Sequence, residues 1–212
     1  MLVIKQLPNI WKPYRILALA PHTDDYELGA GGTIARLVEA GCEVRTINFS
    51  TAHDERLTEE CWTAAKVFTI GRGSCFILDI QVDEFPDYRQ DILQTMVDMR
   101  NEFHPDLVFC PSSFDIHQDH QVVYQEAVRA FKGTTILGWE QPWNNLEFRR
   151  QAIVALEERH FDKKWAALCC YKSQAHRPYM SDTVQTAIAA VNGAFVGAEY
   201  AEAFEVIRWV WK

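Results

Sequence analysis

Short apolar runs alternate with longer amphipathic stretches along most of this chain. The strand candidates are residues 15–20, 43–50, 74–80, 106–112 and 134–140. Between them, apolar residues recur at helical spacing over residues 28–40, 55–70, 88–103 and 118–131. Alternation of this kind is typical of right-handed βαβ units, so the pattern predicts an α/β fold with a mostly parallel sheet.

We expect the five strands to form a doubly wound sheet in the order 3-2-1-4-5. The first and fourth strands are then neighbours, and the chain changes direction between them. Ligands bind to open α/β sheets in the crevice outside the carboxyl ends of such strands. The segments that follow residues 15–20 and 106–112 are therefore predicted to share one site.

The pattern is less regular after Pro142. Residues 151–172 and 181–196 are predicted to be helical, and residues 204–211 to form a last strand. We interpret this region as an irregular C-terminal extension of the same domain, so that residues 1–212 form a single domain.

Two polar motifs stand where the first and fourth strands end. His22-Thr23-Asp24-Asp25 follows the first strand, and His117-Gln118-Asp119-His120 follows the fourth. Taken singly, the first motif also fits a turn with an Asp cap, and the second fits two partly exposed histidines at a helix start. Because the sheet order brings the motifs together, metal-assisted hydrolysis is the leading interpretation.

Zn²⁺ in a hydrolase is typically held by three His, Asp or Glu ligands, which leaves one position for water. His22, Asp25 and His120 satisfy that count. Asp24 is then free to act as the general base, and an uncoordinated His117 imidazolium is expected to stabilise an oxyanion and protonate a leaving amine. Asp119 is expected to orient His117, or else only to favour the helix dipole. Fe²⁺ would also suit this ligand set.

Composition narrows the classes of function. The 212 residues carry a net charge of −8 and are 48% hydrophobic. Without a basic cluster, binding to nucleic acid is not expected. Six cysteines without a paired pattern, no secretory leader and no apolar run near 20 residues predict a cytoplasmic protein that does not span a membrane. A homo-oligomer is compatible with the sequence.

At these motifs the chain resembles the LmbE/PIG-L family of zinc-dependent de-N-acetylases. Pro21 to Thr33 (PHTDDYELGAGGT) resembles the family's PHPDD block with its following glycines, and His117–His120 resembles its HxDH block. The resemblance implies a Rossmann-like three-layer fold, one zinc ion, and the roles given above to the two motifs. It further implies a small-molecule substrate, an N-acetylated sugar or glycoconjugate.

The sequence departs from the family pattern at two positions. Thr23 replaces the usual Pro, and Tyr26 stands where many members have Glu, although Glu27 follows it. Substrate contacts are expected from Arg56, Trp139 and Asn144. For Arg56, pairing with Glu59 or Glu60 on a helix surface is the alternative.

Two other functions remain open at this point. Gly29-Ala30-Gly31-Gly32 at a helix start would suit a module that binds a nucleotide or phosphate, although the GxGxxG spacing is lacking. A member of the family that binds sugar without catalysis is the other alternative. The metal content of the purified protein would distinguish hydrolysis from nucleotide or phosphate binding. Acetate release from N-acetylated sugars would distinguish hydrolysis from sugar binding without catalysis.

Overall fold

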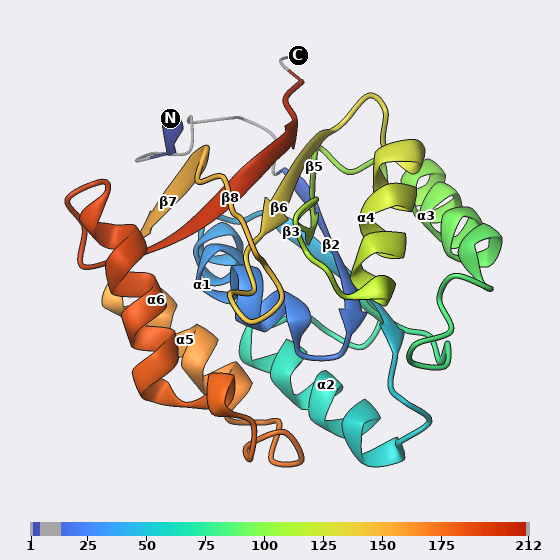
Figure 1. Cartoon of the computed structure of the whole chain (residues 1–212), viewed down its shortest axis with the longest axis horizontal. Helices are drawn as coiled ribbons and strands as arrows, with labels where there is room; N and C mark the ends of the chain where they lie inside the picture. Colours follow the sequence, from blue (N-terminus) through green and yellow to red (C-terminus); the bar gives the residue numbers. More distant parts are fainter. Residues whose placement is uncertain (1, 5–13, 211–212) are drawn as a thin grey trace.

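Eight strands form one sheet in the order β1-β7-β8-β6-β5-β2-β3-β4 (Figure 1). This computed structural model describes residues 2–4, for the backbone only, and residues 14–210. The strands are β1 (Leu2–Ile4), β2 (Arg15–His22), β3 (Glu43–Ser50), β4 (Cys75–Ile77), β5 (Leu107–Pro111), β6 (Thr135–Trp139), β7 (Ala152–Leu156) and β8 (Tyr200–Arg208). The helices are α1 (Asp25–Glu39), α2 (Glu55–Val67), α3 (Arg89–Phe103), α4 (Gln118–Ala130), α5 (Glu158–Leu168) and α6 (Asp182–Ala194), with a 3₁₀ turn η1 (Pro178–Met180).

The predicted core of the sheet is confirmed. Strands β4-β3-β2-β5-β6 have the order 3-2-1-4-5, and all of their pairings are parallel. The first and fourth predicted strands, β2 and β5, are direct neighbours with Ile16 opposite Leu107. Their carboxyl ends therefore open into the same crevice, as the sequence predicts.

Alternate residues of β2 supply the two sides of the core. Ile16, Ala18 and Ala20 pack into a cluster with α1, α2 and α5. Leu17 and Leu19 pack into a second cluster with α3 and α4 on the opposite face. The result is three layers, with α3 and α4 on one side of the sheet and α1, α2 and α5 on the other (Figure 1). A central strand buried on both faces cannot tilt, so the loop that follows it starts from a fixed point.

The prediction for residues 151–172 is wrong over its first part. Residues Ala152–Leu156 form β7, and the helix α5 begins only at Glu158. The run is short, apolar and contains β-branched Ile153 and Val154, so it suits a strand buried between β1 and β8, and periodicity alone cannot separate that case from a helix. The last strand, β8, spans Tyr200–Arg208 rather than 204–211, and residues 211–212 lie outside the described part.

The C-terminal region thus completes the sheet. Strand β8 lies between β6 and β7 and runs antiparallel to both, which makes it the one reversed strand among those described. Of the described helices, none is both long and apolar enough to cross a membrane.

The glycines of α1 serve close packing. A Cβ atom on Gly29 would lie 2.2 Å from Trp139 Cγ, and one on Gly32 would lie 2.4 Å from Leu156 Cδ1. The amide of Gly32 donates to Glu202 at 3.0 Å, and Glu202 in turn pairs with buried Lys164 at 2.8 Å. With these amides covered and bonded to a carboxylate, the glycine stretch does not form a cradle for phosphate.

Candidate metal and hydrolytic site

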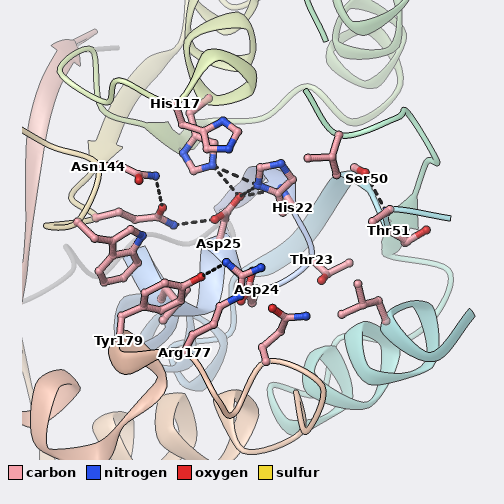
Figure 2. A pocket seen from close by; sticks show the side chains of 18 residues that line it. His22, Thr23, Asp24, Asp25, Ser50, Thr51, His117, Asn144, Arg177 and Tyr179 are labelled. Carbon is pink, nitrogen blue, oxygen red and sulfur yellow. Dashed lines mark hydrogen bonds and ion pairs between the residues drawn. The ribbon is translucent and has the colours of Figure 1, made fainter. Parts of the chain in front are cut away.

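Both polar motifs open into one pocket of about 220 Å³ at the carboxyl ends of the parallel strands. Its floor carries His22, Asp24, Asp25, His117 and His120, from the β2–α1 loop and the start of α4. Figure 2 shows the labelled side chains of His22, Asp24, Asp25 and His117 converging, with Arg177 and Tyr179 closing the pocket from the segment after α5. The convergence predicted from the sheet order is therefore present.

The three predicted ligands, His22, Asp25 and His120, lie close together. The distance from His22 Nδ1 to His120 Nε2 is 3.3 Å, from His22 Nδ1 to Asp25 Oδ2 is 3.4 Å, and from His120 Nε2 to Asp25 Oδ2 is 3.3 Å. Zinc bonds of ~2.0–2.2 Å in a tetrahedral site place the ligand atoms about 3.3–3.6 Å apart. The triangle therefore fits Zn²⁺.

His117 offers a looser alternative. Ligand atoms of His22, His117 and His120 lie within 4.8 Å of one another. That spacing allows a set of three histidines, but it is wider than the triangle that includes Asp25. The histidines and Asp25 together make this pocket a candidate metal site.

Carboxylates contact the outward-facing nitrogens of His22 and His120. Asp119 Oδ2 lies 3.2 Å from His22 Nε2, and Asp115 Oδ2 lies 2.7 Å from His120 Nδ1. A carboxylate in this position fixes the ring orientation of a metal-binding histidine and makes the other nitrogen a better donor. The sequence analysis missed Asp115, although it stands two residues before His117 and its Oδ1 accepts the amide of His117 at 2.9 Å.

Asp119 contacts a different histidine from the one expected. Its carboxylate bonds with His22 and accepts the amide of Asp83 at 2.9 Å, whereas the prediction assigned it to His117. His117 instead meets Asp119 through the cap of α4, where the amide of Asp119 donates to His117 Nδ1 at 3.2 Å.

The charges around the ligand triangle favour a cation. Burial alone would lower the pKa of His22, but Asp119 and Asp25 outweigh it and raise the pKa to about 9. Burial of His120 is likewise outweighed by Asp25 and Asp115, which raise its pKa to about 10. Despite its burial, Asp25 has a pKa well below its usual range because His120 and His22 face it. Without a metal ion, protons on the histidines supply the positive charge that this site attracts.

Asp24 faces the pocket beside the triangle. It is 8% exposed and, although it precedes α1, its side chain makes no capping hydrogen bond to the helix. Burial, followed by the charge of Asp25, raises the pKa of Asp24 to about 6. A carboxylate whose pKa approaches neutrality and whose oxygens are not committed to the helix is suited to accept a proton.

His117 has one nitrogen committed to the backbone. Because Nδ1 accepts the amide of Asp119, the ring proton of the neutral imidazole stands on Nε2. Burial and the neighbouring His120 and His22 lower the pKa of His117. Both facts favour a neutral hydrogen-bond donor rather than the imidazolium that the sequence analysis expected.

Tyr171 fixes the loop from below. Its hydroxyl donates to the carbonyl of Thr23 and lies 2.9 Å from Glu27 Oε1. Burial raises the pKa of Glu27 well above its usual range, although the Tyr171 hydroxyl donates to its carboxylate. Glu27 is therefore a buried support of the loop, and Thr23 in place of Pro retains the carbonyl that Tyr171 holds.

The residues expected to contact substrate lie in three different environments. Asn144 lines the pocket. Trp139 is fully buried against Gly29, so its assignment to the rim is wrong. Arg56 is not among the described residues that line the pocket; its side chain is 61% exposed and pairs with Glu60 at 3.2 Å.

Three of the residues that line the pocket, Gln141, Arg177 and Tyr179, were not found from the sequence. Gln141 and Trp143 follow β6, and Arg177 and Tyr179 come from the segment around η1. Trp143 and Tyr179 stack with ring centroids 4.1 Å apart and an interplanar angle of 13°, and Arg177 donates to the Tyr179 hydroxyl at 2.8 Å. No local pattern links these two segments, because they meet only through the fold.

The fold and the site together define an α/β protein with a candidate His/Asp metal centre at the carboxyl edge of its sheet. Comparison with known proteins gives the family. The GlcNAc-PI de-N-acetylase (PIG-L) family matches residues 17–131. The chain is also 30% identical to the uncharacterized deacetylase YaiS of Escherichia coli strain K12 over 169 residues, which cover 74% of this chain and 90% of YaiS. This protein belongs to the PIG-L family of deacetylases.

Solved structures share the fold. The conserved protein TT1542 of Thermus thermophilus matches with a TM-score of 0.77 at 23% identity, covering 93% of this chain and 96% of TT1542. The N,N'-diacetylchitobiose deacetylase of Pyrococcus horikoshii matches with a TM-score of 0.72 at 20% identity, covering 96% of this chain and 87% of that enzyme. Both likenesses confirm the architecture predicted from the alternating pattern.

Proposed function

We propose that this protein is a zinc-dependent hydrolase that removes the N-acetyl group from an N-acetylated sugar or glycoconjugate. The observation that carries the proposal is the triangle of His22, Asp25 and His120 with Asp24 beside it on the pocket floor. Membership of a deacetylase family supports the reaction class.

In this proposal, His22 Nδ1, Asp25 Oδ2 and His120 Nε2 hold the ion. When bound, Zn²⁺ supplies Lewis-acid chemistry that polarises a carbonyl oxygen and lowers the pKa of a water molecule toward ~7. Asp115 and Asp119 keep the two imidazoles in the orientation and tautomer that direct one nitrogen of each into the pocket.

In this proposal, Asp24 transfers the proton of the attacking water, and His117 stabilises the charge that develops on the carbonyl oxygen. Asp24 accepts a proton from the attacking water and returns it to the leaving nitrogen. His117 donates its Nε2 hydrogen to the carbonyl oxygen as negative charge develops there. We assign the acid step to Asp24 because the Nδ1 of His117 is already bonded to a backbone amide.

The walls of the pocket suit a sugar ring. Trp143 and Tyr179 present a stacked aromatic pair, and Asn144 provides polar atoms on the same side. A volume of about 220 Å³ accommodates a single ring with its acetamido group better than a long chain. A relative of the same fold is named for its action on N,N'-diacetylchitobiose, so an amino sugar is the first substrate to test.

Acetate release tests the proposal directly. The zinc-loaded protein is incubated with N-acetylglucosamine, N,N'-diacetylchitobiose and N-acetylglucosaminyl conjugates, and acetate and free amine are both measured. We expect equal amounts of the two products, and expect far less of both from Asp24→Asn. Binding of these sugars without acetate release would instead support a non-catalytic member of the family.

A further inference from the structure

Gln141 lies against Asp25, one of the proposed metal ligands. It follows β6, is 1% exposed, and its Nε2 donates to Asp25 Oδ1 at 2.7 Å. The other oxygen, Oδ2, lies 3.3–3.4 Å from the histidine nitrogens and also accepts the backbone amide of His22 at 2.7 Å. The two oxygens of Asp25 therefore have different partners.

The amide of Gln141 is held in one orientation. Its Oε1 accepts from Asn144 Nδ2 at 3.4 Å, which leaves Nε2 directed at Asp25. Figure 2 shows this path as two dashed lines that run from Asn144 through an amide side chain to Asp25. The backbone is fixed as well, because the Gln141 amide donates to Asn145 Oδ1 at 2.9 Å and its carbonyl accepts from the amide of Asn144 at 2.8 Å.

Each of the three proposed ligands is held by a hydrogen-bond partner outside the triangle. Each has a partner on the atom that faces away from the triangle: Asp119 for His22, Asp115 for His120 and Gln141 for Asp25. The partners of the histidines are carboxylates, whereas the partner of the aspartate is a neutral amide donor. The Gln141 donor holds Oδ1 away from the two histidine nitrogens and adds no charge.

We propose that Gln141 is a positioning residue that restricts Asp25 to a single ligand oxygen. This inference rests on the metal site of the proposed function. With Oδ1 bonded to Gln141, Asp25 offers only Oδ2, and three protein atoms rather than four surround the ion. One coordination position of a tetrahedral site then stays open toward the pocket.

Cobalt substitution measures coordination number without any assay of turnover. Visible absorption of protein-bound Co²⁺ is stronger for four ligands than for five or six. We compare the Co²⁺-loaded parent with Gln141→Met, which keeps the side-chain length but has no donor, and with Gln141→Asn, whose amide is too short to reach Asp25. Gln185→Met is the matched control, because Gln185 is also buried, at 2% exposure, and donates to the carbonyl of Tyr179.

We expect the parent and Gln185→Met to give the same strong spectrum. Both Gln141 variants should give weaker visible absorption, which indicates a higher coordination number. Their affinity for Co²⁺ should be ~10–100-fold lower, the range found for partners of metal ligands. Thermal unfolding with and without Co²⁺ shows which variants are folded. If one of the two Gln141 variants does not fold, the other still tests the proposal.

The failures of the two proposals differ. If the parent does not take up one Co²⁺ per chain, the metal site itself is wrong and the role of Gln141 falls with it. If the parent binds Co²⁺ and a folded Gln141 variant keeps the parental spectrum and affinity, the role of Gln141 is overturned while the metal site stands.

Discussion

The floor of the pocket and its rim are built in different ways. The floor takes its polar side chains from two short motifs, residues 22–25 and 117–120, each fixed at the end of a buried parallel strand. The rim takes Trp143, Arg177 and Tyr179 from two segments that no local pattern connects. In the proposed function, the chemistry therefore depends on the strand ends, whereas we expect the loops to select among substrates.

The largest expected effect comes from removing a floor ligand. His120→Ala takes away one corner of the triangle and leaves Asp25 and Asp115 without their positive partner. Loss of a whole ligand should exceed the ~10–100-fold effect of losing an outer partner, so bound zinc and turnover should both fall to background. Metal content after dialysis measures this, with His104→Asn as the control at an exposed histidine. Retention of zinc by H120A would place the ion elsewhere.

The next effect separates chemistry from metal binding on the same floor. Asp24→Asn keeps the shape of the side chain but cannot accept a proton. Turnover should fall by ~10²–10⁴-fold, the usual contribution of a general base, while zinc content stays at one ion per chain. Steady-state kinetics with metal analysis on the same sample gives both numbers. Parental turnover in D24N would remove Asp24 from the mechanism.

A third prediction concerns pH. In the metal-free protein, His22 and His120 have pKa values raised to about 9 and about 10, from 6.5, so both are protonated at neutral pH. Zinc must displace both protons, and its affinity should rise ~100-fold per pH unit between pH 6 and 8, since each displaced proton contributes a factor of ten. Titration calorimetry in buffers of different ionisation enthalpy counts the protons released. Release of none would show that the histidines are not ligands.

The same pKa shifts predict how the metal-free fold responds to pH. A histidine whose pKa is higher in the folded than in the unfolded state stabilises the fold fully below the unfolded pKa of 6.5. That stabilisation is lost as pH rises through about 9 for His22 and about 10 for His120. Metal-free protein should therefore lose thermal stability between pH 7 and 10, and zinc should reverse the loss.

A rim substitution should alter binding rather than chemistry. Trp143→Ala removes the aromatic face that stacks on Tyr179. Because an aromatic stack is worth ~0.5–1.5 kcal/mol, KM should rise up to about tenfold with kcat nearly unchanged. If kcat falls as steeply as in D24N, the division between floor and rim is wrong.

The smallest effect is expected at Arg56. Its side chain is 61% exposed and its ion pair with Glu60 spans one helical turn. Such surface pairs contribute ~0.2–1 kcal/mol, so Arg56→Gln should lower the free energy of unfolding by no more than that amount. The value of kcat/KM should stay within about threefold of the parent. A rise in KM of tenfold or more would return Arg56 to the substrate site.

The sequence predicted the floor well for a physical reason. Apolar runs such as residues 15–20 form strands that are buried on both faces. Because the neighbouring parallel strands end at the same edge of the sheet, His22 and His120 lie together there. Trp139 was misplaced because a tryptophan at a strand end reads alike whether it faces solvent or fills the space left by Gly29. Strand β7 was taken for helix because its short apolar run carries no distinguishing period.

Other features depend on tertiary contacts that the sequence does not display. Asp119 was assigned to the nearer histidine in the chain, but its carboxylate contacts His22 from the other motif. Gln141 and Asp115 were missed since neither belongs to a recognisable metal-binding spacing. The side-chain partners of His22, Asp25 and His120 are thus less predictable than the meeting of these three residues.

Anomalous diffraction at the zinc absorption edge, from crystals of the protein loaded with one equivalent of zinc, tests the central claim most directly. The account predicts a single strong peak within bonding distance of His22 Nδ1, Asp25 Oδ2 and His120 Nε2. A peak bonded to other residues, with this triangle left empty, would contradict it.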